Sequence, residues 1–511
     1  MEKEIIVDIN PYQTRVVLLE DGLPSEVYIE RRGRERLVGN IYKGKVQNVL
    51  PGMQAAFVDI GLERNAFLYA GDIQMDRSDF TFSGDEGEIR QAPLNIRDIV
   101  KPGQEVMVQI VKEPVGTKGA RVTTNITLPG RSLVLMPSVN YVGVSRRIEN
   151  EEERSRLKGM LDDIAAEHNM GVIVRTAAEG KTEEEFRSDM LFLARLWDRI
   201  RQKSRLVSAP RLIHAEEPLV FRTIRDLFTQ DIKRLVINDR DFYEKILVVA
   251  GIISPQLRDK VQLYEDIPDM FDILGLESAI DKALSRKVWM KNGGYIIIDQ
   301  TEALTTIDVN TGKYVGNTDN LQETITATNC EAAKEIARQL RLRDISGIII
   351  VDFIDMDEIS DKERVLQTLR TELQKDRTKS NVLGITQLGL VEMTRKKTRQ
   401  CISHTLQSAC PYCGGDGKVL SPETVVLKIR KQLMRYYAAE TPADYLVCVH
   451  PEIAEIIKDH SAPKNALLPT PEGKDIYVHS DVHMRVDEFK INRIDSLDEL
   501  RNAQKVGKVY N

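Results

Sequence analysis

The stretch from residue 295 to residue 354 constrains the fold of this 511-residue chain more than any other. Residues 295–299 and 304–309 have the pattern of two strands joined by a tight turn, and a helix is expected from about Leu321 to Arg343. Residues 347–354 are almost wholly apolar, which is typical of a strand that is buried on both faces of a sheet. A strand, a long helix and a strand in this order predict a layered α/β unit.

Two aspartates stand at the ends of strands in this unit. Asp308 ends one strand just before Asn310, and Asp352 ends the apolar run. A carboxylate at the tip of a buried strand is costly unless it is paired, hydrogen-bonded or bound to a metal, and two on neighbouring strands would offer the oxygen ligands that Mg²⁺ takes. The alternative is that each aspartate caps a turn or pairs with an arginine. The nearby arginines are Arg338, Arg341 and Arg343, and the aspartates that compete for the metal are Asp299, Asp355 and Asp357.

Length and composition describe a multidomain soluble protein. A chain of this length exceeds what one hydrophobic core supports, so roughly three to five domains are expected. Its 72 basic and 78 acidic residues give a net charge of −6, so any surface for nucleic acid must be a local basic patch. The charged N-terminus lacks the apolar run of a signal peptide, and no run of apolar residues is long enough to span a membrane. Five scattered cysteines form no disulfide framework, and a cytoplasmic protein without a membrane partner is expected.

The regions around the α/β unit differ in their apolar patterns. Residues 1–35 alternate apolar and polar positions, as short strands do. Residues 36–125 contain many short strands broken by glycines, which suggests a small barrel, and the acidic residues 76–93 are expected to be a mobile surface insertion. Residues 421–511 alternate helices and strands, which predicts a small α+β module.

Between the barrel and the α/β unit, strands and helices are mixed. Strands are expected at residues 133–136, 171–174 and 246–250. The clearest helix runs from Thr182 to about Lys203, because Thr182 and Glu185 form the pattern of a capping box ahead of an apolar face.

Two phenylalanines of the predicted barrel have lysines nearby in sequence. Phe57 and Phe67 lie on either side of a glycine turn, and Lys112 and Lys118 follow. Aromatic faces on an OB-type barrel stack unpaired bases, and lysines follow the phosphates of the backbone. The competing interpretation is that both rings belong to the core, as phenylalanines in strands usually do.

A cysteine motif follows the α/β unit. Cys410 and Cys413 precede three glycines, the pattern of a zinc knuckle, in which glycines let the backbone approach the thiolates. Two thiolates are half of a tetrahedral site, so either a second chain or Cys401 and His404 would complete it. A redox pair fits less well, because no strand leads into the motif.

Two basic motifs remain open. Arg175 and Thr176 follow a predicted strand, and an arginine fork beside a hydroxyl suits a terminal phosphate, although a solvated surface pair is common. Residues 395–399 are basic and suit either an RNA-facing strip or an ordinary charged face.

Taken together, nine segments resemble the catalytic region of the ribonuclease E/G family in composition and in order. The resemblance runs from about residue 36 to 420 and rests on residues 40–46, 55–59, 145–148, 174–177, 301–304, 307–310, 337–344, 351–356 and 410–413. The chain has no long Pro- or Arg-rich tail, so it looks like the shorter G type of the family rather than the E type with its scaffold tail.

The resemblance implies a multidomain α/β and α+β architecture. An RNase H-like domain (1–35 and 220–283) would be interrupted by an OB-fold RNA-binding domain (36–125) and a 5′-phosphate sensor (126–219). A DNase I-like catalytic domain (284–406), a zinc link (407–420) and a small domain (421–511) would follow.

The resemblance also implies roles for particular residues. It implies that Asp308 and Asp352 bind Mg²⁺, with Asn310 as an orienting neighbour in the catalytic group. It also implies that Cys410 and Cys413 bind a Zn²⁺ that is shared between two chains. RNA would contact Phe57, Phe67, Lys112 and Lys118, and its 5′-monophosphate would contact Gly130, Val134, Arg147, Arg175 and Thr176.

The function implied is that of a Mg²⁺-dependent endoribonuclease. It would hydrolyse single-stranded, A/U-rich RNA with an activated water, favour 5′-monophosphorylated substrates, and act on ribosomal RNA precursors and messenger RNA. The zinc would hold a homodimer, with a tetramer as a further step. The alternative is a non-catalytic RNA-binding dimer that acts in ribosome assembly.

Overall fold

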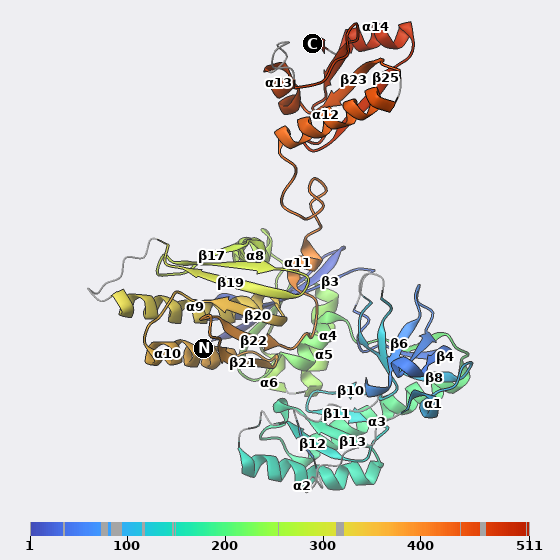
Figure 1. The fold of residues 1–511 in the computed structure, drawn as a ribbon. Coiled ribbons are helices and arrows are strands. Elements are labelled where there is room, and N and C mark those ends of the chain that lie inside the picture. The colour runs from blue at the N-terminus through green and yellow to red at the C-terminus, as the bar shows by residue number, and fades with distance from the viewer. Residues whose placement is uncertain are drawn as a thin grey trace. The chain divides into compact units, whose positions relative to one another are not determined.

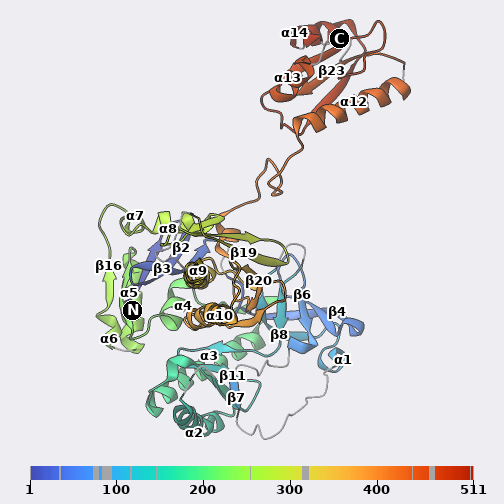
Figure 2. The same cartoon turned by 60° about the vertical axis from the view of Figure 1, so that its left-hand side comes forward.

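The computed structural model describes most of the chain, in two compact units, Met1–Thr405 and Leu406–Asn511 (Figures 1 and 2). The described residues are 2–33, 36–72, 80–82, 95–114, 118–145, 148, 150–253, 255–312, 321–439, 441–459, 467–506 and 508–509. Among the helices in these ranges, none is both long and apolar enough to cross a membrane.

The first sheet joins the start of the chain to a much later segment. Its strand order is β16-β15-β1-β2-β3. The strands are β1 (Lys3–Ile9), β2 (Gln13–Glu20), β3 (Leu23–Arg31), β15 (Ile232–Ile237) and β16 (Val261–Leu263). The accompanying helices are α4 (Leu219–Asp226), α5 (Arg240–Ile253), α6 (Pro255–Arg258), α7 (Met270–Ile273) and α8 (Leu276–Leu284). Ile5 and Val16 of the sheet share one core with Ile224 of α4 and Ile246 of α5.

The strand predicted at residues 246–250 is wrong, because these residues lie inside α5. Ile246 and Ala250 are both buried, four residues apart on one helix face. A short apolar run does not by itself distinguish a strand from a helix that is buried along one side.

The predicted barrel is confirmed. Its strands pair in the order β4-β5-β6-β9-β8, and β8 also pairs with β4, which closes the barrel. These strands are β4 (Ile41–Leu50), β5 (Ala55–Asp59), β6 (Ala66–Tyr69), β8 (Glu105–Lys112) and β9 (Arg121–Thr123), and β14 (Arg211–His214) adds to the outside of β4. The short helices η1 (Pro51–Met53), η2 (Ala70–Asp72) and α1 (Ile96–Ile99) lie in its connections.

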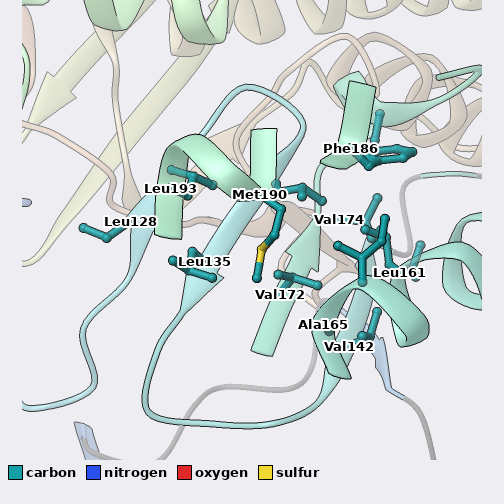
Figure 3. Packing of buried hydrophobic residues seen from close by; sticks show 14 of the residues in the cluster. Leu128, Leu135, Val142, Leu161, Ala165, Val172, Val174, Phe186, Met190 and Leu193 are labelled. Atoms are coloured by element: carbon teal, nitrogen blue, oxygen red, sulfur yellow. The ribbon is translucent and has the colours of Figure 1, made fainter. Parts of the chain in front are cut away.

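A second sheet follows the barrel in the order β10-β11-β13-β12-β7. It contains β7 (Phe80–Phe82), β10 (Leu128–Pro129), β11 (Leu133–Met136), β12 (Val142–Ser145) and β13 (Gly171–Val174), with α2 (Glu151–His168), η3 (Thr176–Ala178) and α3 (Glu183–Leu206). Figure 3 shows Leu161 of α2 and Met190 of α3 packed against Val172 of β13. The predicted capping box is confirmed, with Thr182 as N-cap of α3.

Part of the predicted insertion at residues 76–93 is a strand. Residues 80–82 form β7 and pair antiparallel with β12, so this part of the segment joins a sheet instead of forming a loop. The other residues of 76–93 lie outside the described ranges.

The third sheet of the first unit has the order β17-β18-β19-β20-β22-β21. Its strands are β17 (Lys287–Trp289), β18 (Tyr295–Gln300), β19 (Leu304–Asn310), β20 (Gly347–Asp352), β21 (Ser380–Ile385) and β22 (Val391–Arg395). The helix α9 (Leu321–Arg343) connects the parallel strands β19 and β20, and α10 (Ile359–Leu373) packs beside α9 (Figures 1 and 2). The predicted order of strand, strand, helix and strand is confirmed, and α11 (Ile402–Leu406) ends this part of the chain.

Only one face of the third sheet is buried, so the prediction that residues 347–354 are buried on both faces is wrong. Ile307, Ile349 and Val351 pack into one core with α9 and α10. On the opposite face Ile348 is 50% exposed and Ile350 is half-buried. Alternate side chains of the apolar run therefore pack against the helices α9 and α10, and the other face of the sheet is accessible to solvent.

The second unit is the predicted α+β module. Its sheet has the order β25-β23-β24-β26. The elements are α12 (Pro422–Ala439), β23 (Asp444–Val449), α13 (Pro451–Asp459), β24 (Ile476–Ser480), β25 (Phe489–Ile494), α14 (Leu497–Val506) and β26 (Lys508–Val509). Val426 and Ile429 of α12 pack on Val447 of β23.

Candidate functional site

The open face of the third sheet brings Asp308 and Asp352 together. They are partners in the register of the parallel strands β19 and β20, and both side chains are exposed. Asn310 lies two residues beyond Asp308, on the same face, and its Nδ2 donates a hydrogen bond to Asp308 Oδ2 at 2.8 Å. The sequence predicted two aspartates at strand ends, and the register of the sheet makes them neighbours.

The two carboxylates repel each other. Partial burial raises the pKa of Asp352, and the negative charges of Asp308 and Asp355 raise it further. Within the described residues, neither Asp308 nor Asp352 forms an ion pair, and no group of three or more His, Cys, Asp or Glu side chains is placed to hold a metal ion. Two neighbouring carboxylates without an ion pair are a site that a divalent ion would stabilise.

The arginines that competed for these aspartates are engaged elsewhere. Arg338 pairs with Glu335, Arg341 with Glu20 and Glu26, and Arg343 Nε donates to Gln339 Oε1 at 2.6 Å. Two of the competing aspartates also have partners, since Asp299 pairs with Arg286 and Asp357 accepts a hydrogen bond from Gln322. Asp355 is exposed and acts on Asp352 through its charge.

One row of side chains crosses the outside of the barrel. Phe57 pairs with Phe67 between β5 and β6, Phe67 with Arg121 between β6 and β9, and Arg121 with Lys112 between β9 and β8. The two rings stand edge to face with centroids 5.9 Å apart. Both rings are half-buried and lie outside the barrel core, which is built from their neighbours in sequence. The interpretation of these rings as core residues is therefore wrong.

Arg121 joins this row without having been predicted. It forms an ion pair with Asp72, and its guanidinium lies 5.5 Å from the centre of the Tyr69 ring. Its position depends on the pairing of β9 between β6 and β8, which no local pattern shows. Lys118, exposed near the start of β9, is the remaining predicted cation.

Four of the five residues predicted around a terminal phosphate are described, and two of them, Gly130 and Arg175, are in direct contact. Arg175 Nη1 donates to the carbonyl of Gly130 at 2.7 Å, and Arg175 N donates to Ser132 O beside it. Val134 pairs with Ile173, two residues before Arg175, and Thr176 is exposed at the start of η3. Arg147 lies outside the described residues.

Asp226, at the end of α4, is a partner of Arg175 that the sequence did not indicate. Its Oδ1 accepts a hydrogen bond from Arg175 Nη1 at 2.7 Å, and Arg225 binds it from the other side. Burial alone would raise the pKa of Asp226, but the two arginines outweigh it and lower the pKa. Among the described residues, Nε and Nη2 of Arg175 have no hydrogen-bond partner, so part of the fork is available to an anion.

The cysteine motif belongs to the second unit. Gly417 N donates to Cys413 Sγ at 3.2 Å, and Gly414, Gly415 and Gly417 all have positive φ. Backbone amides of Cys413 and Tyr412 lower the pKa of Cys410. Cys401 and His404 belong to the first unit, and Cys401 Sγ lies 3.3 Å from Ser403 Oγ. The turn therefore provides the backbone donors that stabilise thiolates in a knuckle.

Comparisons with known proteins cover both parts of the site. The model of the ribonuclease E/G family matches residues 127–398, and the model of the S1 RNA binding domain matches residues 37–125. The chain belongs to the ribonuclease E/G family. The strands that carry Asp308 and Asp352 lie within the first match, and the row of Phe57, Phe67 and Lys112 lies within the second.

Individual members of the ribonuclease E/G family match nearly the whole chain. Ribonuclease G of Haemophilus influenzae is 45% identical over 492 residues, which cover 96% of this chain and 99% of that protein. Ribonuclease G of Escherichia coli K12 is 44% identical over the same shares. Ribonuclease E of Haemophilus influenzae is 36% identical and covers all of this chain, but the match spans 53% of that protein. The similarity runs the length of both chains for the G type, as the sequence indicated.

Proposed function

We propose that this protein is an endoribonuclease that hydrolyses single-stranded RNA on the open face of the third sheet. The observation that carries the proposal is the pairing of Asp308 with Asp352 in register, exposed and without an ion pair among the described residues. The membership in the ribonuclease E/G family and the S1 match support RNA as the substrate.

The residues present fit a Mg²⁺ ion. Asp308 and Asp352 would hold it through two carboxylates, and the raised pKa of Asp352 reflects a repulsion that a bound cation would relieve. When bound there, Mg²⁺ would neutralise charge on the scissile phosphate and make water more acidic. Asn310 would hold Asp308 in one orientation through its hydrogen bond to Oδ2. Attack by water in line with the leaving oxygen would give a 5′-phosphate and a 3′-hydroxyl.

The outer row of the barrel would bind the RNA strand. Phe57 and Phe67 offer ring surface to unpaired bases, and Lys112 with Lys118 would follow the phosphates. Stable duplex would be refused, because its base faces are already stacked. A/U-rich RNA is the expected substrate because it is the least structured.

The contacts around Arg175 support a pocket for a 5′-monophosphate. The Gly130 carbonyl and Asp226 hold Nη1 of the guanidinium, so its remaining nitrogens and the hydroxyl of Thr176 would bind the phosphate. Val134 and Arg147 would complete the pocket. A monophosphate would be preferred to a triphosphate because one arginine fork and a few backbone donors fit a single phosphate group and crowd a longer one.

We further propose that Cys410 and Cys413 give half of a Zn²⁺ site and that a second copy of the chain gives the other half, making a homodimer that can pair into a tetramer. The glycine turn and its donors to sulfur suit such a knuckle. Zinc content would decide between this site and the alternative with Cys401 and His404. About one half ion per chain supports the shared site, and about one per chain supports the alternative.

The proposed architecture assigns the first sheet to an RNase H-like domain and the third to a DNase I-like domain. The joining of β1 to β15 in one sheet supports a domain interrupted by the barrel and the sensor. We propose the cytoplasm as the location, and precursors of ribosomal RNA and messenger RNA as the substrates.

The test is cleavage of a 5′-monophosphorylated, A/U-rich single-stranded RNA in the presence of Mg²⁺, with Asp308→Asn beside the parent. Cleavage by the parent alone, with RNA binding retained in the variant, is the expected result. Binding without cleavage by either protein would replace the proposal with the non-catalytic RNA-binding dimer. A DNA strand of the same sequence, tested in parallel, decides whether the enzyme requires ribose.

A further inference from the structure

Two aromatic side chains stand beside the carboxylate pair without a structural task. Trp289 of β17 is 57% exposed, and the half-buried Tyr295 of β18 is its partner in register. Their ring centroids are 5.3 Å apart at an interplanar angle of 63°. Neither ring belongs to the core of the third sheet, where Val288 and Ile296 of the same strands pack. The two rings together offer an exposed aromatic surface on this face of the sheet, of the kind on which a nucleobase stacks.

The register puts this aromatic pair on the same face as the aspartates. Trp289 pairs with Tyr295, and Tyr295 pairs with Asn310 across β18 and β19. Paired residues of neighbouring strands share a face, so the two rings and Asn310 form one row. The next row contains Ile297, Asp308 and Asp352. Since strands are about 4.8 Å apart, β17 lies roughly 10 Å from β19, a distance that one nucleotide with its base can bridge.

A lysine adds a cation to the two rings. Lys287 Nζ lies 4.0 Å from the centre of the Trp289 ring and 3.6 Å from that of Tyr295. Lys287 also pairs with Ile297, which pairs with Asp308, so it shares the row of the carboxylates. The positive charge therefore lies against the aromatic pair, on the same sheet face as the position proposed for the scissile phosphate.

Close backbone packing fixes the aromatic hairpin to the strand end that carries Asn310. A Cβ on Gly312 would lie 2.5 Å from Gly293 O and 3.2 Å from the ring of Tyr295. A Cβ on Gly294 would lie 2.9 Å from Asn310 O. Only glycines permit this approach, so the turn between β17 and β18 packs directly against the end of β19.

We propose that Trp289, Tyr295 and Lys287 form a base-binding subsite, at which the nucleobase of a nucleotide next to the scissile phosphodiester stacks on the Trp289 ring. Stacking tolerates any base because every base has a π-face, and Lys287 would meet the phosphate of that nucleotide. The subsite rests on the proposed function, since it places RNA across Asp308 and Asp352. It is separate from the row of Phe57 and Phe67 on the barrel.

The first test combines a change in the ring with a change in the base. Trp289→Leu removes the aromatic ring and keeps apolar bulk, and KM for a single-stranded RNA cut at one position should rise about tenfold. The same RNA with an abasic nucleotide beside the cleavage position should be cut with equal KM by the parent and by Trp289→Leu. Tyr12→Leu, which changes an aromatic side chain that is 83% exposed in the turn between β1 and β2, is the matched control and should leave KM unchanged.

The second test reads binding without cleavage. The chain has two tryptophans, Trp197 and Trp289, so Trp197→Phe leaves Trp289 as the single reporter. In that background, with Asp352→Asn added to stop cleavage, the RNA should quench the fluorescence of Trp289, and the abasic RNA should quench it several-fold less.

The outcomes separate the subsite from the proposed function. If the parent cuts RNA and Trp289→Leu raises KM as much for the abasic RNA as for the intact RNA, the subsite is rejected. The proposed nuclease activity then still stands. If the parent does not cut, fluorescence in the Trp197→Phe background still decides whether a base stacks there. A change in oligomeric mass on Trp289→Leu, with unchanged KM, would assign the ring to a protein interface and overturn the proposal.

Discussion

Two groups of aspartates in the same α/β unit have opposite surroundings. Asp344 and Asp376 are buried, and Arg395 binds both, with 2.6 Å from Nη1 to Asp344 Oδ1 and from Nε to Asp376 Oδ2. Arg399 Nε also binds Asp344 at 2.6 Å. Asp308 and Asp352, on the open sheet face, have each other as neighbours and no ion pair among the described residues.

The difference separates structural from functional carboxylates. The charges of the buried aspartates are neutralised by arginines within the protein. These carboxylates therefore stabilise the fold and are not available to a ligand. The negative charges of an exposed carboxylate pair are not neutralised within the protein, so the pair favours binding of a cation from solution. The same comparison explains two of the basic residues in 395–399, because Arg395 and Arg399 bind aspartates, whereas Lys396 and Lys397 are exposed.

The largest effect is expected from Asp352→Asn. Cleavage of single-stranded RNA at saturating Mg²⁺ should fall by at least about 10³-fold, the scale of losing several kcal/mol of charge stabilisation. The midpoint of thermal unfolding should not fall, because the substitution removes a repulsion with Asp308. The control is Asp299→Asn, a strand aspartate that is paired with Arg286 and should retain near-parent activity. An equal loss in both variants would break the comparison.

The next effect concerns stability and comes from Asp344→Asn. Asparagine accepts the positive φ of 52° at this position, so the change removes charge without backbone strain. Because the buried Arg395 and the half-buried Arg399 lose a carboxylate, the free energy of unfolding should fall by about 3–5 kcal/mol. Urea unfolding followed by circular dichroism measures it. Asp299→Asn, in an exposed pair, should cost less than about 1 kcal/mol.

An intermediate effect is expected at Arg175, because only part of its guanidinium is bound by other groups of the protein. Asp226 and Gly130 occupy one nitrogen of its fork. Arg175→Lys keeps the charge but loses the planar fork, so the preference in kcat/KM for 5′-monophosphorylated over 5′-hydroxyl RNA should drop about tenfold. Equal losses on both RNAs would show that Arg175 supports the fold and does not read the phosphate.

The smallest effect is a dependence of stability on pH. Because the pKa of Asp352 is raised in the folded state, the folded protein holds this proton more tightly than the unfolded chain does. The contribution of Asp352 to the free energy of unfolding is therefore fully present below the ordinary aspartate pKa. It is lost as pH rises through the raised pKa of the folded state. Without Mg²⁺, Asp352→Asn should flatten the fall in thermal midpoint across this window. Adding Mg²⁺ to the parent should have the same effect, and identical pH profiles for both proteins would contradict the repulsion.

Local patterns predicted what depends on neighbours in sequence. The capping box of α3 and the strand, helix and strand around Asp308 and Asp352 follow from periodicity and turn chemistry, and both are confirmed. Residues 246–250 were predicted as a strand because an apolar run of this length fits either element. Burial on one face of β20 also escaped prediction, since it depends on which side α9 and α10 pack.

Partners that are distant in sequence could not be predicted. Asp226 reaches Arg175 from α4, and Arg121 enters the barrel row through the pairing of β9 with β6 and β8. The arginines of α9 looked available to the aspartates, but Arg341 extends to Glu20 and Glu26 of the first sheet. Each of these contacts is set by the packing of layers, which single-sequence periodicity does not encode.

Synthesis of the protein imposes a delay on the folding of the first sheet. β1 needs β15 beside it, and roughly 200 residues separate the end of β3 at Arg31 from the start of β15 at Ile232. At ~5–20 residues per second, a ribosome takes about 10–40 s to make them. During that interval β1 keeps one edge of unpaired amides and carbonyls, which invites pairing with other nascent chains. The barrel and the second sheet can fold meanwhile, so the order of translation makes the N-terminal strands wait for the last part of their own sheet.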